Sequence, residues 1–104
     1  MGNSMDPVHI EHIADTTHVT LEAALGIADA RALCRKLGAA LAAATPVVMD
    51  ASRVERLDAA VMQVLTGFCR AARERSLTLT WQNPSPIFQQ AVRLLGLESI
   101  FEMT

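Results

Sequence analysis

The sequence predicts an α/β fold in which a small, mostly parallel sheet of four strands is covered by helices. Some segments alternate between apolar and polar side chains, as strands do, and others repeat an apolar side chain every three or four residues, as helices do. The two kinds of segment follow one another along the chain. Strands that alternate with helices are joined by right-handed crossovers, which make neighbouring strands parallel. The chain has 104 residues, of which 51% are hydrophobic, enough for the core of one domain. We expect that domain to span residues 7–104, after a flexible segment over residues 1–6.

The first half of the chain is predicted to contain a hairpin and a helix. Residues 8–13 partly alternate in polarity and residues 18–21 alternate clearly, with a polar stretch at 15–17 between them, so we expect two strands. From Ile27 the apolar period becomes helical, and Pro46 ends the helix because its ring cannot continue it. The positions expected to form the buried stripe of this helix are Ala30, Leu33, Cys34, Leu37, Leu41 and Ala44.

The second half is predicted to contain two further strands and two helices. Residues 47–49 form a continuous apolar run, which is typical of a central strand covered on both faces. A helix is expected after Asp58, whose carboxylate can accept hydrogen bonds from the free amides of the first turn. Residues 77–81 alternate strictly and predict a strand, Ser85 is placed as the N-cap of the last helix, and residues 97–101 add a partial turn. The positions predicted to face the core in these helices are Val61, Val64, Leu65, Phe68, Cys69, Ala72, Phe88, Ala91, Val92 and Leu95.

Charge and cysteine usage exclude several classes of function. Nine Lys and Arg against eleven Asp and Glu give a formal charge of -2, which lacks the basic excess that nucleic-acid binding needs. No apolar run approaches the roughly 20 residues that cross a bilayer, and the N-terminal stretch has no signal-peptide pattern, so we expect a cytoplasmic protein without direct membrane insertion. Cys34 and Cys69 lie at apolar positions of the two long helices, where a thiol packs as a small hydrophobe in a reducing compartment.

The titratable side chains form no catalytic or metal-binding pattern in the sequence. His9, His12 and His18 all lie on the predicted hairpin, and His9 and His12, three residues apart, point to opposite faces of a strand. We therefore interpret them as solvated strand histidines. The glycine patterns of nucleotide-binding loops and the nucleophile elbow of hydrolases do not occur. The expectation is a protein that is not an enzyme and has no cofactor and no metal site.

The stretch over residues 47–60 is the place where function is expected to concentrate. In an open parallel sheet, binding sites collect where strands end and helices begin, because a helix start presents free amides and a positive dipole end. Asp50 follows the central strand, Val54 and Leu57 are spaced to point inward, and Asp58 opens the helix. From the residues alone, a strand exit followed by a helix cap is the simpler explanation of this pattern.

At this point the chain resembles the STAS domain family, typified by bacterial anti-sigma factor antagonists. The elements that carry the resemblance are Asp-Ala-Ser at 50–52, Val-Glu-Arg-Leu-Asp at 54–58, Asn-Pro-Ser-Pro at 83–86 and Leu-Leu-Gly-Leu at 94–97. The resemblance implies the STAS (anti-sigma factor antagonist-like) fold. It also implies a binding role without enzymatic activity.

In many members of this family, the hydroxyl directly after the helix-opening Asp is phosphorylated by a partner kinase, and the added charge repels the partner. Here Ala59 occupies that degenerate phosphosite position and Ala60 follows it, so neither can accept a phosphate. Ser52 and Thr66 are the hydroxyls nearby; Ser52 is expected to bond to local backbone, and Thr66 lies two turns into the helix.

The surface that the resemblance leaves for partner binding has an apolar centre and a charged rim. Met62 is predicted to be the exposed apolar residue of this surface, whereas Val61 fits the core and the surface equally. The predicted partner-binding residues are Ser52, Arg53, Arg56, Asp58, Ala59, Ala60, Val61 and Met62.

Two functions are therefore weighed. The first is a non-enzymatic interaction domain in bacterial signal transduction, binding an anti-sigma factor or, in a chemotaxis or other two-component system, a histidine kinase or response regulator. The alternative is a cytoplasmic STAS subunit of an ABC-type lipid transporter, bound to its ATPase. A permanently bound subunit buries a larger and more apolar face, and the outward helix positions, such as Arg70 and Gln90, are mostly polar, which favours a transient partner. Exposed strand edges also allow a homodimer.

Overall fold

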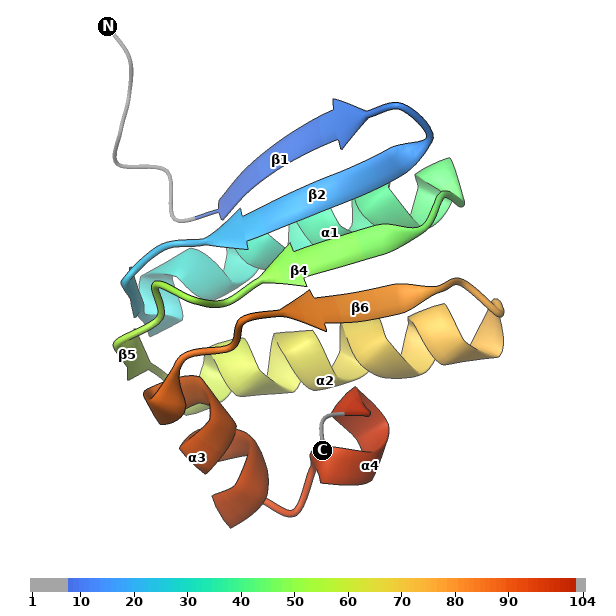
Figure 1. The fold of residues 1–104 in the computed structure, drawn as a ribbon. Helices are drawn as coiled ribbons and strands as arrows, with labels where there is room; N and C mark the ends of the chain where they lie inside the picture. Colours follow the sequence, from blue (N-terminus) through green and yellow to red (C-terminus); the bar gives the residue numbers. More distant parts are fainter. Residues whose placement is uncertain (1–7, 103–104) are drawn as a thin grey trace, which may run out of the picture.

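The computed structural model describes residues 8–102 and contains a four-stranded sheet (Figure 1). The strands are β1 (Val8–Ile13), β2 (Thr16–Leu21), β4 (Val47–Asp50) and β6 (Leu79–Gln82), in the order β1-β2-β4-β6. β1 and β2 form the expected antiparallel hairpin, and β2, β4 and β6 run parallel. The prediction of a small, mostly parallel sheet is confirmed. The expectation for residues 1–6 falls outside the described residues.

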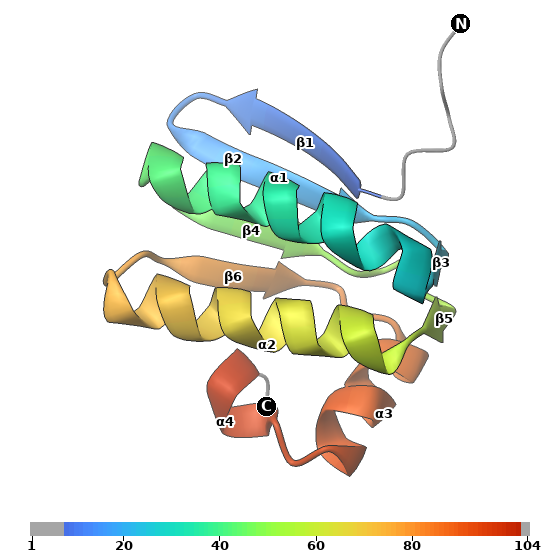
Figure 2. The ribbon, with the colours of Figure 1, turned by 180° about the vertical axis from the view of Figure 1, so that it is seen from behind.

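One face of the sheet is covered by two long helices, α1 (Ala30–Ala43) and α2 (Ala59–Glu74), which lie side by side behind the strands (Figures 1 and 2). Val19, Leu21 and Met49 point into this layer and are fully buried. β4 is central as predicted, but its expected cover on both faces is wrong. Val48 is only half-buried, because among the described residues no helix lies over the second face.

The stripe that α1 buries is narrower than predicted. Leu33, Leu37 and Ala40 are buried, but Cys34 is exposed, which corrects its assignment to the core. Cys34 lies about 100° around the helix from Leu33, beyond the arc that meets the sheet and α2. The helix ends where Ala44 adopts a left-handed conformation with φ of 56°, two residues before Pro46.

The stripe that α2 buries is turned towards Met62 relative to the prediction: Met62 is buried, and Val64, predicted to face the core, is half-buried. α2 contacts α1 on one flank and α4 (Glu98–Phe101) on the other, so packing covers more of its circumference than a sheet alone would. Val61 is fully buried and only 4% of Met62 is exposed. The prediction that Met62 is a surface residue is therefore wrong. The buried positions of α2 are Val61, Met62, Leu65, Phe68, Cys69 and Ala72.

The C-terminal part of the chain closes the core beside β6 with an aromatic cluster. Trp81 on β6 stacks on Phe101 of α4, with ring centroids 5.3 Å apart, and packs against Phe88 of α3 (Pro86–Leu94) at 5.0 Å. Ser85 caps α3 as predicted, and the expected partial turn over 97–101 is the short helix α4. Among the described residues, no helix combines the length and apolar character that a membrane span requires.

A second, two-stranded sheet was not predicted. β3 (Ala24–Leu25) pairs in parallel with β5 (Arg56–Leu57), and the single 3-10 turn η1 (Ile27–Asp29) follows β3. These elements lie at the end of the molecule where α2 begins (Figure 2). They position the stretch between β4 and α2.

Candidate functional site

The loop between β4 and α2 is fixed in place by hydrogen bonds of its own backbone. The Ser52 amide donates to Asp50 Oδ1 at 2.9 Å and turns the chain out of β4. The amides of Glu55 and Arg56 both donate to the carbonyl of Ala23, at 2.7 and 3.0 Å. Further along, the Asp58 amide donates to the carbonyl of Leu25 at 3.0 Å. The loop is therefore held from both ends and through its middle.

A buried serine supports the same loop from the side of α3. Ser85 Oγ donates to the carbonyl of Val54 at 2.6 Å and accepts from the Phe88 amide at 3.1 Å. The Ser85 amide donates to the carbonyl of Ala51 at 3.0 Å. Val54 is fully buried, as its spacing predicted. One residue therefore caps α3 and connects it to two carbonyls of the loop.

The start of α2 presents small side chains to solvent. Asp58 has an extended backbone and its Oδ1 accepts from the Ala60 amide at 3.0 Å, which confirms the predicted N-cap. Ala59 is exposed and Ala60 is half-buried. Val61 and Met62 face the core, so these two members of the predicted binding surface are not available to a partner. The exposed apolar part of the helix start is reduced to the two alanines.

The charged rim is present, with a carboxylate that sequence reasoning missed. Ser52, Arg53 and Arg56 are all exposed. Arg53 Nη1 lies 3.3 Å from Glu22 Oε2, and the same oxygen lies 2.8 Å from His9 Nε2. Glu22 directly follows β2. Because β2 and β4 are parallel neighbours, their carboxyl ends lie side by side, and Glu22 is brought next to the loop that follows β4.

The largest exposed apolar side chain near this loop is Ile27, which sequence analysis placed at the start of the first helix. Ile27 lies in η1, which packs against α2, and 71% of its surface is exposed. Asp29 Oδ2 accepts from the Gly26 amide at 2.8 Å, which forms the turn that directs Ile27 outward. The signal for this turn in the sequence was Gly26 followed three residues later by Asp29. A shallow cleft beside Ile27 is lined by Ala24, Leu25, Gly26, Arg56, Leu57 and Asp58.

Several nucleophilic and titratable side chains of the sheet and α2 are buried or held by local hydrogen bonds. Burial raises the pKa of the Cys69 thiol from 9.0 to about 12, which leaves it protonated and unreactive. Thr66 Oγ1 donates to the carbonyl of Met62 at 2.7 Å within its own helix. His9 bonds to Glu22, and His12 Nδ1 lies 3.2 Å from Thr17 Oγ1. Residues 8–102 contain no group of three or more His, Cys, Asp or Glu side chains arranged to hold a metal ion.

The outward surface of α3 is more apolar than its sequence indicated. Leu94 and Leu95 are 77% and 57% exposed, and Ile87 is also exposed. Leu95 had been assigned to the core, but the helix ends at Leu94 and the chain turns away. Ile87 and Leu94 are seven residues apart and so share one side of the helix.

Comparisons with known proteins agree on the family and the fold. The family model described as "Mlab, STAS domain" matches residues 8–102. The phosphorylated form of the Bacillus cell fate determinant SpoIIAA is similar in structure, with a TM-score of 0.73 at 17% identity over 88% of this chain and 86% of that chain. The unphosphorylated form of the anti-sigma factor antagonist SpoIIAA gives 0.70 at 18% identity, over 84% and 82%. An anti-sigma factor antagonist from Mycobacterium paratuberculosis gives 0.73 at 22% identity, over 90% and 80%. No curated protein sequence matches the chain.

Proposed function

This chain belongs to the STAS domain family, and we propose that it is a non-enzymatic interaction domain of bacterial signal transduction that binds a histidine kinase, a response regulator or an anti-sigma factor. The observation that carries the proposal is the loop of residues 51–58, which is held rigidly and ends at an exposed helix start. The structural similarity to anti-sigma factor antagonists supports the fold on which the proposal rests. We expect the protein to act in the cytoplasm.

The proposed contact surface is a revised form of the one predicted from sequence. Its apolar centre consists of Ala59 and Ile27, which are exposed, in place of Val61 and Met62. Arg53 and Arg56 form the rim, because both are exposed beside the helix start. A surface with a small apolar centre and charged margin suits a transient partner. Because its loop is already ordered, binding requires little additional ordering of the chain.

The proposed mode of action does not include phosphorylation at the usual position. Ala59 has no hydroxyl that could form a phosphate ester. Thr66 is occupied by a hydrogen bond to its own helix, which leaves Ser52 as the exposed hydroxyl of the loop. A partner that recognises the unmodified helix start is therefore bound whenever both proteins are present, with no switch at residue 59.

The test is affinity capture of the tagged protein from its own cells, followed by mass spectrometry. The test variant is Ala59→Glu, which adds a negative charge to the exposed helix start. The matched control is Arg70→Glu, an exposed position three turns further along the same helix. Both variants are first checked by thermal melting. A kinase, response regulator or anti-sigma factor captured by the wild type and Arg70→Glu, but lost in Ala59→Glu, is expected. The same capture by all three proteins would contradict the proposed surface.

A permanent subunit of an ABC-type lipid transporter is the second candidate, and the surface of α3 favours it. Obligate interfaces are larger and more apolar than transient ones, and Leu94 and Leu95 are mostly exposed beside Ile87. On this proposal, an ATPase and its permease would be captured, and Leu94→Glu would abolish their capture. Capture that survives Leu94→Glu but fails in Ala59→Glu would assign binding to the α2 surface instead.

A further inference from the structure

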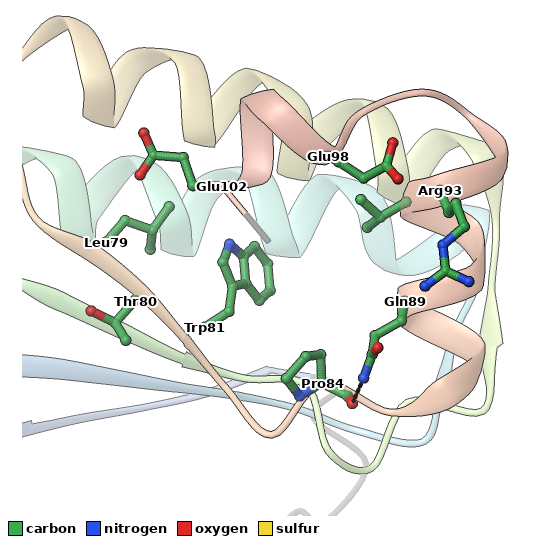
Figure 3. Close-up of a pocket in the computed structure, with 9 residues that line it drawn as sticks. Leu79, Thr80, Trp81, Pro84, Gln89, Arg93, Glu98 and Glu102 are labelled. Atoms are coloured by element: carbon green, nitrogen blue, oxygen red, sulfur yellow. Dashed lines mark hydrogen bonds between the residues drawn. The ribbon is translucent and has the colours of Figure 1, made fainter. Parts of the chain in front are cut away.

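A cleft lies beside β6, on the opposite edge of the sheet from the hairpin, and the proposed function does not use it. It has a volume of about 500 Å³, within the range of small binding sites. Trp81 of β6 faces Arg93 and Gln89 of α3 across the cleft, with Glu98 of α4 at one side (Figure 3). Leu79 and Val92 also line it and make part of its wall apolar.

The strand along this cleft has an unused edge. β6 is the last strand of the sheet, and within residues 8–102 no further strand pairs with it. The Val47 amide donates to the carbonyl of Thr78 at 2.9 Å, so the backbone carbonyl of Thr78 points towards β4. In a parallel ladder the backbone groups of alternate residues face the same neighbour, so those of Leu79 and Trp81 face outward. Two amides and two carbonyls are therefore directed to the side on which the cleft lies.

The wall of the cleft is rigid and has an unsatisfied donor behind it. Trp81 packs against Phe101 and Phe88 at centroid distances of 5.3 and 5.0 Å, and these two rings lie 6.0 Å from each other. Its indole Nε1 is buried and has no hydrogen-bond partner in the described part of the chain. Buried donors are nearly always paired, so this end of the cleft is a place where an added acceptor, or a small shift of α4, would be stabilising.

Charge at the rim indicates what a ligand would carry. Arg93 is exposed and makes no ion pair with another residue of the range 8–102, and its guanidinium presents a fork that pairs well with a carboxylate. Gln89 Nε2 is held by the carbonyl of Pro84 at 2.9 Å and forms the floor next to Arg93. Glu98, on α4, and Glu102, which follows α4, also line the cleft, and Glu102 Oε2 is paired with Arg73 Nη2 at 2.9 Å. An occupant with a carboxylate toward α3 matches this distribution.

We propose that the β6 edge and this cleft bind an extended segment of a partner protein by strand addition. The segment pairs its backbone with Leu79 and Trp81, places an apolar side chain against the side chains of the same two residues, and places a carboxylate beside Arg93. A small organic acid would satisfy Arg93 but not the outward backbone groups of two residues, which an extended chain satisfies together. The site is separate from the α2 surface, so a protein can occupy either one.

The experiment uses Trp81 as its own reporter, because the chain has one tryptophan and no tyrosine. The probes are acetylated, amidated five-residue peptides of the form Thr-X-Glu-X-Thr, where X is valine, leucine, isoleucine or phenylalanine. Controls carry lysine in place of glutamate, or N-methyl groups at the two X positions. We expect the glutamate peptides to shift Trp81 emission to shorter wavelengths and to perturb the amide resonances of Leu79 and Trp81. The N-methylated peptides should do neither, because their backbone cannot pair.

Two variants make the test specific. Arg93→Glu should weaken the glutamate peptides about tenfold and favour the lysine peptides, since it reverses the charge at the rim. Arg70→Glu, exposed on α2 and outside the cleft, should bind as the wild type does. No emission change with any glutamate peptide at millimolar concentration overturns the proposal. So does binding of phenylacetate with no binding of peptides, which would assign the cleft to a small acid. A dimer of the protein alone that Arg93→Glu dissociates would assign the edge to a second copy, and would also overturn it.

Discussion

Replacing the Ser85 hydroxyl should destabilise this domain more than most single substitutions do. Ser85→Ala removes a donor to the Val54 carbonyl at 2.6 Å and an acceptor for the Phe88 amide at 3.1 Å. Both bonds are buried, so water cannot replace them without a rearrangement of the loop. The substitution therefore acts on two elements together, the start of α3 and the loop before α2.

The magnitude follows from the two bonds taken separately. Loss of a serine N-cap costs about 1 kcal/mol. A buried carbonyl left without its donor costs about 1–3 kcal/mol. The free energy of unfolding should therefore fall by about 2–4 kcal/mol in Ser85→Ala. For a domain of this size the urea m-value is about 1.5 kcal/mol/M, so the unfolding midpoint should fall by about 1.3–2.7 M.

The assay is urea unfolding followed by Trp81 fluorescence, since Trp81 packs against Phe88, two residues into the capped helix turn. Ser85→Thr keeps the hydroxyl and should lose less stability than Ser85→Ala. Ser52→Ala is the matched control, because Ser52 is exposed and its amide, not its side chain, bonds to Asp50. A Ser85→Ala midpoint within about 0.3 M of the wild type would refute the claim that one hydroxyl supports both elements.

Four other predictions concern the core, the cysteines and the helix start. Asp58→Ala should lower the melting temperature by about 4–8 °C, because it removes an N-cap worth about 1 kcal/mol, as differential scanning calorimetry can measure. Met49→Asp should abolish the cooperative melt in near-ultraviolet circular dichroism, whereas Val48→Asp should keep it, since Met49 is fully buried and Val48 is half-buried on the uncovered face. With its pKa raised to about 12, Cys69 should not react with Ellman's reagent at about pH 8 in the native protein, whereas Cys34 should. Above pH 9 the unfolded state loses the Cys69 proton first, so stability should fall as pH rises, and this dependence should be weaker in Cys69→Ala.

The elements that periodicity predicted are those whose burial is set by a single partner layer. β2 and β6 alternate in burial because one face of each strand meets the helices, and Ser85 and Asp58 are caps whose bonds are local. The two-residue strands β3 and β5 have no pattern of their own. They pair because the exits of β2 and β4 lie side by side, which is a consequence of the tertiary fold.

The wrong predictions for Met62, Cys34 and Ile27 also arise from contacts that only the tertiary fold determines. Periodicity gives the approximate direction of a buried stripe but not its limits, which depend on the helices that flank it. Met62 is buried because α1 and α4 both contact α2, whereas Cys34 is exposed because the arc that α1 buries is narrower. Ile27 was placed in a helix, but a turn held by Asp29 directs it outward. Which helices pack beside α1 and α2 is decided by the tertiary fold, and the local sequence pattern does not specify it.

The loop before α2 owes its shape to contacts that do not involve residue 59. Its backbone is held by Ala23 and Leu25 on one side and by Ser85 on the other, and these bonds are the same whether residue 59 carries a hydroxyl or not. On the proposed function, the alanine at position 59 therefore leaves the contact surface intact while offering no hydroxyl to a kinase. Control over the proposed complexes would then pass to the amount of protein or to the partner.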